Sequence, residues 1–120
     1  MRYLNENEIE PYINAGKVIE QYLGTFKYDD LQCHRFISIG KDKEGYYSFI
    51  VEVFDEHGEG IESIYDFCSI DPDNPEGIEY GPMISLTELL SELKKRVTLL
   101  DDKFLLAGFL NDIMTAENEK

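Results

Sequence analysis

The sequence predicts one α+β domain over residues 1–120, with an antiparallel sheet between terminal helices. Apolar residues recur at helical spacing near the N-terminus, and leucine-rich stripes of the same spacing return near the C-terminus. Between them lie runs of β-branched and aromatic residues separated by short glycine-containing turns, which are typical of strands. Because the strands are grouped rather than alternating with helices, we expect the helices to pack on one face of the sheet.

The N-terminal helix is predicted within residues 1–24. Its apolar face consists of Ile9, Tyr12, Ile13, Ile19 and Leu23. Pro11 is tolerated in the first turn of a helix, where its missing N–H is not needed, so the helix is expected to begin between Asn7 and Glu10. Gly24 is a suitable C-cap residue for the end of this helix.

The sheet is predicted within residues 32–83 as an antiparallel meander of three or four strands. The first three strands are expected at residues 33–39, 46–54 and 61–70, joined by turns at 41–45 and 56–60. Turns this short join neighbouring antiparallel strands and leave no room for a crossover. The second strand is apolar on both faces and is therefore expected at the centre of the sheet.

Two further strands are compatible with the sequence. Residues 25–31 allow a strand before the meander, although Asp29 and Asp30 weaken that interpretation. Residues 78–81 allow a short fourth strand after a loop at 71–77, which carries two prolines and a glycine.

Two helices are predicted within residues 85–116. Ser85 or Thr87 can cap the first helix, and Ser85 with Glu88 forms the pattern of a capping box. The apolar stripe of this helix consists of Leu86, Leu90, Leu93 and Val97. Asp101 is the expected N-cap of the second helix. The apolar face of that helix is expected to consist of Phe104, Leu105, Phe109, Leu110, Ile113 and Met114.

No motif in the chain predicts catalysis, a metal or a cofactor, so we expect none of the three. Cys33 and Cys68 are expected to be buried thiols, and with His34 and His57 they show no zinc-ligand spacing. The acidic loop at 71–77 lacks the glycine and glutamate positions of a calcium-binding EF-hand loop. The glycine clusters do not match a phosphate-binding loop. We expect a cytoplasmic protein, because neither a secretory signal nor a membrane-spanning run is recognisable.

The distribution of charge is the most informative functional feature of the sequence. The formal net charge is −14, and the fifty residues of segment 44–93 contain thirteen carboxylates but no Lys or Arg. A one-sided field of this kind attracts cationic partners and disfavours direct binding to nucleic acid. The residues predicted to bind a basic protein partner are Asp55, Glu56, Glu59, Glu62, Tyr65, Asp66, Asp71, Asp73, Glu76, Glu79 and Tyr80.

Two segments give the chain a resemblance to a known class of proteins. Residues 47–55, YSFIVEVFD, and 64–72, IYDFCSIDP, precede a leucine-rich helix in a small acidic domain. In this respect the chain resembles the immunity proteins of bacterial polymorphic toxin and contact-dependent growth inhibition systems. The resemblance implies a non-enzymatic protein that binds a cognate toxin domain, commonly a basic nuclease, and covers its active or substrate-binding surface.

Two other functions are compatible with the same sequence. A nucleic-acid mimic that inhibits a DNA-binding enzyme would use the same carboxylates, but it should bind several DNA-binding proteins and be displaced by DNA. A small enzyme would instead place His34 or His57 beside a carboxylate in a deep cleft.

Overall fold

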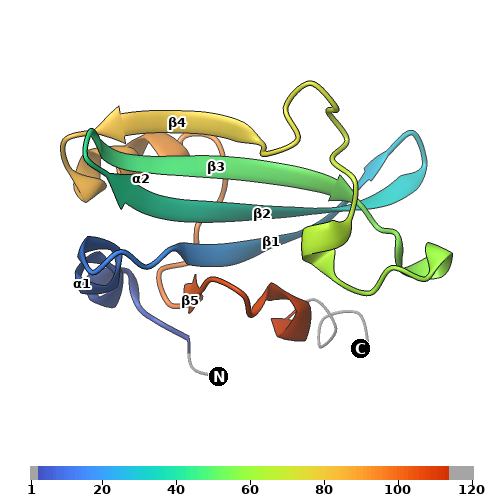
Figure 1. Cartoon of the computed structure of the whole chain (residues 1–120), viewed down its shortest axis with the longest axis horizontal. Coiled ribbons are helices and arrows are strands. Elements are labelled where there is room, and N and C mark those ends of the chain that lie inside the picture. The colour runs from blue at the N-terminus through green and yellow to red at the C-terminus, as the bar shows by residue number, and fades with distance from the viewer. Residues whose placement is uncertain (1–2, 114–120) are drawn as a thin grey trace.

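The computed structural model describes residues 3–113, which form an α+β fold around a five-stranded antiparallel sheet (Figure 1). The strands are β1 (Ile19–Tyr28), β2 (Leu31–Asp42), β3 (Gly45–Phe54), β4 (Ile78–Met83) and β5 (Leu105–Leu106). Their order across the sheet is β4-β3-β2-β1-β5. The helices are α1 (Ile9–Asn14) and α2 (Leu86–Lys94), with short 3₁₀ turns η1 (Glu6–Glu8), η2 (His57–Glu59) and η3 (Ile64–Asp66).

Each face of the sheet is covered by a different part of the chain. On one face, which we call the helix face, α1 and α2 pack over the sheet. Its buried cluster contains Leu4, Ile9, Ile13, Ile19, Ile37, Ile39, Tyr46, Ile50, Leu86, Leu89, Leu90, Leu93 and Phe104. On the other, the loop face, the segment after β3 and the C-terminal segment cover a second cluster. Its buried residues are Phe36, Val51, Val53, Ile64, Phe67, Leu105, Leu110 and Ile113.

The predicted N-terminal helix is only partly correct. α1 begins at Ile9, as expected, with Pro11 in its first turn, but it ends at Asn14. Gly16, at a φ of +91°, follows that helix, whereas Gly24 lies at a register shift inside β1. The spacing misled the prediction because Ile19 and Leu23 are four residues apart, and an even spacing also places two residues on one face of a strand.

The predicted third strand at 61–70 is wrong. Its centre forms η3, where Ser63 Oγ accepts a hydrogen bond from the N–H of Tyr65 at 3.3 Å, and only Ser69 makes an isolated bridge to Val53. Two of the apolar residues that led to the strand prediction, Ile64 and Phe67, are three residues apart, and both pack in the loop-face cluster. A three-residue spacing fits a helical turn, and the segment therefore covers the sheet instead of joining it.

The two additional strands considered for the sheet are both present. β1 runs to Tyr28 and β2 starts at Leu31, and Asp29 and Asp30 form the turn between them at positive φ values of 50° and 66°. Asp tolerates this left-handed conformation better than most residues, so the aspartates make the hairpin rather than oppose it. β4 includes the expected residues 78–81, and β2 rather than β3 occupies the centre of the sheet.

The first of the two C-terminal helices is confirmed and the second is largely wrong. Ser85 Oγ accepts a hydrogen bond from the N–H of Glu88 at 3.1 Å and caps α2, whose leucines enter the helix-face cluster. Asp101 lies in a turn instead of capping a helix, and Phe104 pairs with Leu4 in an isolated bridge. Leu105 then joins β5, and helical structure begins only at residue 110. The predicted position Met114 lies outside the described residues.

Candidate protein-binding surface

The antiparallel topology brings most of the acidic residues to one end of the sheet. β1 and β3 both finish at this end, and β2 and β4 both start there. The hairpin turn 29–30 and the segments 55–66 and 71–76 therefore gather at the end of the sheet away from α1 and α2 (Figure 1). We call these three segments the acidic end. They contain ten carboxylates and no Lys or Arg.

Three of the predicted partner-binding carboxylates hold loops of the protein itself. Asp55 accepts hydrogen bonds from the N–H of His57 at 3.0 Å and from the side chain of Gln32 at 3.0 Å. Glu56 accepts one from the N–H of Cys68 at 2.8 Å. Asp71 accepts from the N–H of Asp73 and from the Asn74 amide, at 3.0 and 2.8 Å. These groups shape the acidic end and are only partly exposed.

Other carboxylates of the acidic end are exposed and have no salt bridge to any residue in the described part of the chain. They are Asp29, Asp30, Glu59, Glu62, Asp66, Asp73 and Glu76. Five of them were predicted from the sequence, whereas Asp29 and Asp30 were missed because they lie before the cation-free segment. The recognisable signal for these two was the turn chemistry of consecutive aspartates between two strand-like runs.

Two further predicted residues, Glu79 and Tyr80, point to opposite faces of β4. Glu79 is paired with Phe49 in the register and is exposed. Tyr80 is paired with Ser48 and packs against the helix-face cluster, where the guanidinium of Arg96 lies 4.7 Å from the centre of its ring. Since successive residues of a strand alternate between faces, the two side chains do not share one flat surface.

Tyr65, predicted as an aromatic anchor, is bound by its hydroxyl to the protein itself. The hydroxyl lies 2.7 Å from Glu20 Oε1 and accepts hydrogen bonds from the N–H groups of Gly108 and Leu110 at 3.0 and 3.2 Å. Burial and the bond to Glu20 raise the pKa of Tyr65, and burial raises the pKa of Glu20. The residue is 41% exposed, and because its hydroxyl is engaged within the protein, Tyr65 can offer a partner mainly apolar surface.

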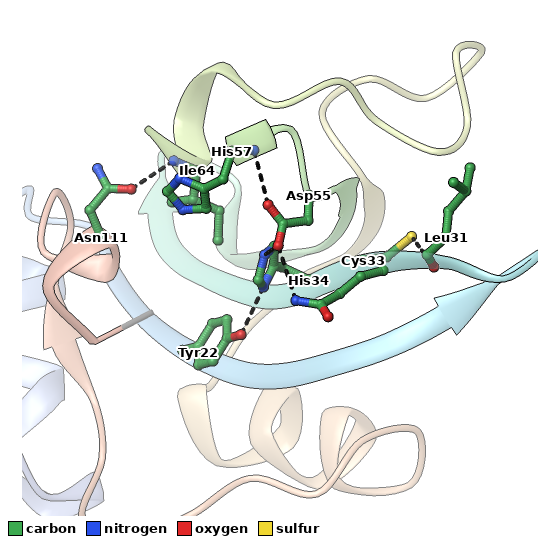
Figure 2. A network of polar contacts seen from close by, with 9 residues as sticks. Tyr22, Leu31, Cys33, His34, Asp55, His57, Ile64 and Asn111 are labelled. Atoms are coloured by element: carbon green, nitrogen blue, oxygen red, sulfur yellow. Dashed lines mark hydrogen bonds and ion pairs between the residues drawn. The ribbon is translucent and has the colours of Figure 1, made fainter. Parts of the chain in front are cut away.

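A polar network under the acidic end contains the first of the two histidines. His34 is fully buried, and its Nδ1 lies 2.8 Å from the Tyr22 hydroxyl (Figure 2). Its Nε2 lies 3.2 Å from Asp55 Oδ2, which is an ion-pair distance without the alignment of a good hydrogen bond. The ring also stacks on Phe67. The network thus connects β1 and β2 to the segment that follows β3.

The burial of His34 favours the neutral form of its ring. Burial lowers the pKa of His34, and the nearby Asp55 carboxylate opposes this effect only in part. A neutral ring with the proton on Nε2 can accept from Tyr22 and face Asp55 with its N–H. Because the ring has no exposed surface, a substrate cannot reach it, and the network acts as a cross-link within the fold.

This charge state predicts a pH dependence of stability. The unfolded chain takes up a proton on His34 below about pH 6.5, whereas the folded chain resists it, so the free energy of unfolding should fall as the pH drops through that value. One linked proton gives a slope of at most about 1.4 kcal/mol per pH unit. Urea unfolding of the wild type and His34→Gln between about pH 5.5 and pH 7.5 measures the slope. The slope should be smaller in the variant.

The other histidine provides the control for this measurement. His57 is exposed, its N–H bond to Asp55 uses only the backbone, and His57→Gln leaves the contacts of His34 in place. Glu20, whose raised pKa contributes with the opposite sign at lower pH, is common to all three proteins. Equal slopes in the wild type and His34→Gln would show that His34 does not resist protonation.

Neither cysteine has the properties of a nucleophile. Cys33 is buried, as expected, and burial is the main cause of the raised pKa of its thiol. The prediction for Cys68 is wrong because its side chain is exposed; the Glu56 carboxylate raises the pKa of this thiol. A raised pKa reduces the thiolate fraction on which cysteine chemistry depends. Within residues 3–113, His, Cys, Asp and Glu side chains form no group of three or more that could hold a metal ion.

Three consecutive basic residues lie at the C-terminal end of α2 and are already paired. Lys94 lies 2.7 Å from Glu6, and both Lys95 and Arg96 lie 3.0 Å from Glu92. With Arg35 they line a shallow depression of about 370 Å³. The charges therefore complement neighbouring carboxylates and the negative end of the helix dipole.

Fold and surface together define a small α+β domain with an antiparallel sheet and an acidic end. No protein-family model, curated protein or solved structure matches the chain. None of the helices in the described residues is long and apolar enough to span a membrane.

Proposed function

We propose that the protein is a bacterial immunity protein that binds a cognate basic toxin domain, a nuclease, and blocks its active or substrate-binding surface. The observation that supports this proposal best is the acidic end, where seven exposed carboxylates have no salt bridge to any residue of segment 3–113. Carboxylates without a neighbouring cation produce a negative field that attracts a basic partner. In the proposed complex they take the place of the phosphates that a nuclease binds.

The polar networks favour a binding role over an enzymatic one. His34 does lie beside a carboxylate, as a small enzyme would require, but it is fully buried between β1 and Phe67. His57 is exposed and rests with its ring edge-on against Phe67, where neither Asp55 oxygen reaches its ring in a described contact. We therefore propose inhibition by coverage of the partner, without chemistry by this chain.

The proposal is tested by capture and by protection. The whole chain, immobilised, is expected to retain one basic protein from an extract of the bacterium that encodes it, identified by mass spectrometry. Expression of that protein alone should kill a laboratory bacterial host, and co-expression of this chain should restore growth. A harmless captured protein, or a toxic one against which the chain gives no protection, would refute the immunity role.

The same capture separates the immunity role from nucleic-acid mimicry. An immunity protein is selective for one partner, because the pattern of charges and rings excludes others. A mimic should retain several DNA-binding proteins and release them when duplex DNA is added, since DNA competes for the same basic surfaces. Release of a single toxic partner only at high salt supports the proposed function.

A further inference from the structure

A groove of about 360 Å³ opens on the helix face at the acidic end, beyond the part covered by α2. Ile50 and Glu52 of β3 form its floor, Tyr28 of β1 lines one side, and the segment containing Asp71, Asn74 and Ile78 lines the other. Gly77 makes this arrangement possible: it has a φ of +97°, and an added Cβ would overlap the carbonyl oxygen of Ile50. The loop can lie against β3 only with glycine at this position.

The lining of the groove combines apolar surface with negative charge. Tyr28 and Ile78 are 48% and 47% exposed, which is high for large apolar side chains in a small domain. Glu52 and Asp71 carry charges in the lining itself, and Asp29, Asp30, Asp73 and Glu76 lie on adjoining turns. The lining contains no Lys or Arg. Isolated exposed apolar residues are ordinary, but these two line one groove together with carboxylates, so apolar surface and negative charge are combined there.

One cation of the protein lies beside the groove without filling it. Arg35 pairs with Glu52 across the strands, donating from Nε to Glu52 Oε2 at 2.7 Å, and its guanidinium lies 4.9 Å from the centre of the Phe26 ring. It therefore neutralises one carboxylate of the floor. Asp71 uses its two oxygens within the loop, but a carboxylate offers about four acceptor positions and can bind a further donor.

We propose that this groove receives an arginine side chain of the protein partner, an assignment that rests on the proposed function and names the chemistry that the acidic end recognises. The methylene stem of the arginine packs on Ile50 and Ile78, and the guanidinium lies against the Tyr28 ring with Asp71 as its carboxylate. A planar guanidinium suits this combination of ring and carboxylate better than the compact, strongly hydrated ammonium group of lysine.

The groove is first tested without the partner. The probe is Nα-acetyl-arginine methylamide, with the corresponding citrulline compound as an uncharged control of nearly the same shape. Amide signals of Asn74, Gly77 and Ile78 in proton–nitrogen NMR spectra should shift with the arginine compound and saturate in the range of about 1 to 10 mM, since a single side chain binds weakly. Equal shifts with citrulline, or shifts that avoid these amides, would overturn the assignment.

The partner then tests whether the groove contributes to the complex. Ile78→Arg places the protein's own guanidinium at the groove and should weaken binding of the captured partner by about 30-fold, as expected when a hot-spot contact is blocked. Ile84→Arg is the matched control, because Ile84 is 92% exposed outside the groove and makes the same change in charge. Tyr28→Ser removes the ring without adding charge and should weaken binding in the same direction.

The two levels of the proposal fail in different ways. If the chain captures and neutralises a toxin, and the folded variants Ile78→Arg and Tyr28→Ser bind that toxin as the wild type does, the groove assignment is wrong and the immunity role stands. If the arginine probe binds in the groove but no toxic partner is neutralised, the immunity role is wrong and the arginine site stands. Thermal unfolding of each variant confirms that a loss of binding is not a loss of fold.

Discussion

Replacing Phe104 with alanine should lower the free energy of unfolding by about 3 to 5 kcal/mol, the largest effect expected from a single substitution in this chain. Phe104 is fully buried in the helix-face cluster and directly precedes the edge strand β5. Its backbone exchanges two hydrogen bonds with Leu4, at 2.7 and 3.2 Å, and so joins the two ends of the described chain. Loss of the ring leaves a cavity where these segments meet. Urea unfolding, with all variants at one pH, measures the effect.

The control is the second phenylalanine of the same segment. Phe109 is 42% exposed, and Phe109→Ala should change the free energy of unfolding by less than about 0.5 kcal/mol. A continuous helix after Asp101 would bury both rings on one apolar face, and the two alanine variants would then cost similar amounts. Similar losses of stability would contradict the bridge between Leu4 and Phe104.

The difference between these two phenylalanines illustrates what the sequence pattern could not resolve. Apolar spacings of three and four residues fit a helix, but a strand followed by one helical turn produces them as well. Leu105 of β5 pairs with Glu20 of β1. Gly108, at a φ of +106°, separates β5 from the helical turn at 110–113. Whether residue 105 joins a helix or a strand depends on its pairing with Glu20 on the edge of β1, eighty-five residues earlier in the chain. Local pattern contains no information about that contact.

Elements whose signals are local were predicted well. The start of α2 follows from its cap at Ser85, and β2 and β3 follow from long β-branched runs joined by a tight turn. Ile61 to Ile70 carries comparable apolar content but has only the single bridge of Ser69. Its backbone bonds to β3 are confined to its end, from the N–H of Phe54 to Cys68 O and from the N–H of Ile70 to Glu52 O, whereas the N–H of Ile64 donates to Asn111 Oδ1 at 2.7 Å. A side chain distant in the sequence therefore contributes to the conformation of this segment, and the local pattern does not reveal it.

For the acidic surface, too, the sequence shows which residues are charged but not which contacts they make. Composition identified the excess of carboxylates, and topology alone adds Asp29 and Asp30 by bringing the first hairpin to the end where β3 finishes. The hydrogen bonds of Asp55, Glu56 and Asp71 could not be seen in composition, because their donors are backbone N–H groups and the amides of Gln32 and Asn74, which the fold positions. The exposed carboxylates are therefore the appropriate residues for substitution.

Neutralising four exposed carboxylates of the acidic end should slow association with the captured partner by about 10- to 100-fold at low salt and change dissociation little. The variant combines Glu59→Gln, Glu62→Gln, Asp66→Asn and Glu76→Gln, and removes four negative charges from side chains with no described salt bridge. Stopped-flow measurements between about 0.05 M and about 0.5 M salt should show a weaker salt dependence for the variant, since fewer charges remain to be screened.

The matched control removes the same total charge from elsewhere on the protein. Glu10, Glu44, Asp101 and Asp102 are exposed and lie outside the acidic end, so the corresponding Gln and Asn variant removes the same number of negative charges. If steering depends on where the carboxylates lie, this control should keep most of the wild-type association rate and its salt dependence. Equal slowing in both variants would mean that net charge alone attracts the partner, and the acidic end would then lose its assignment as the recognition surface.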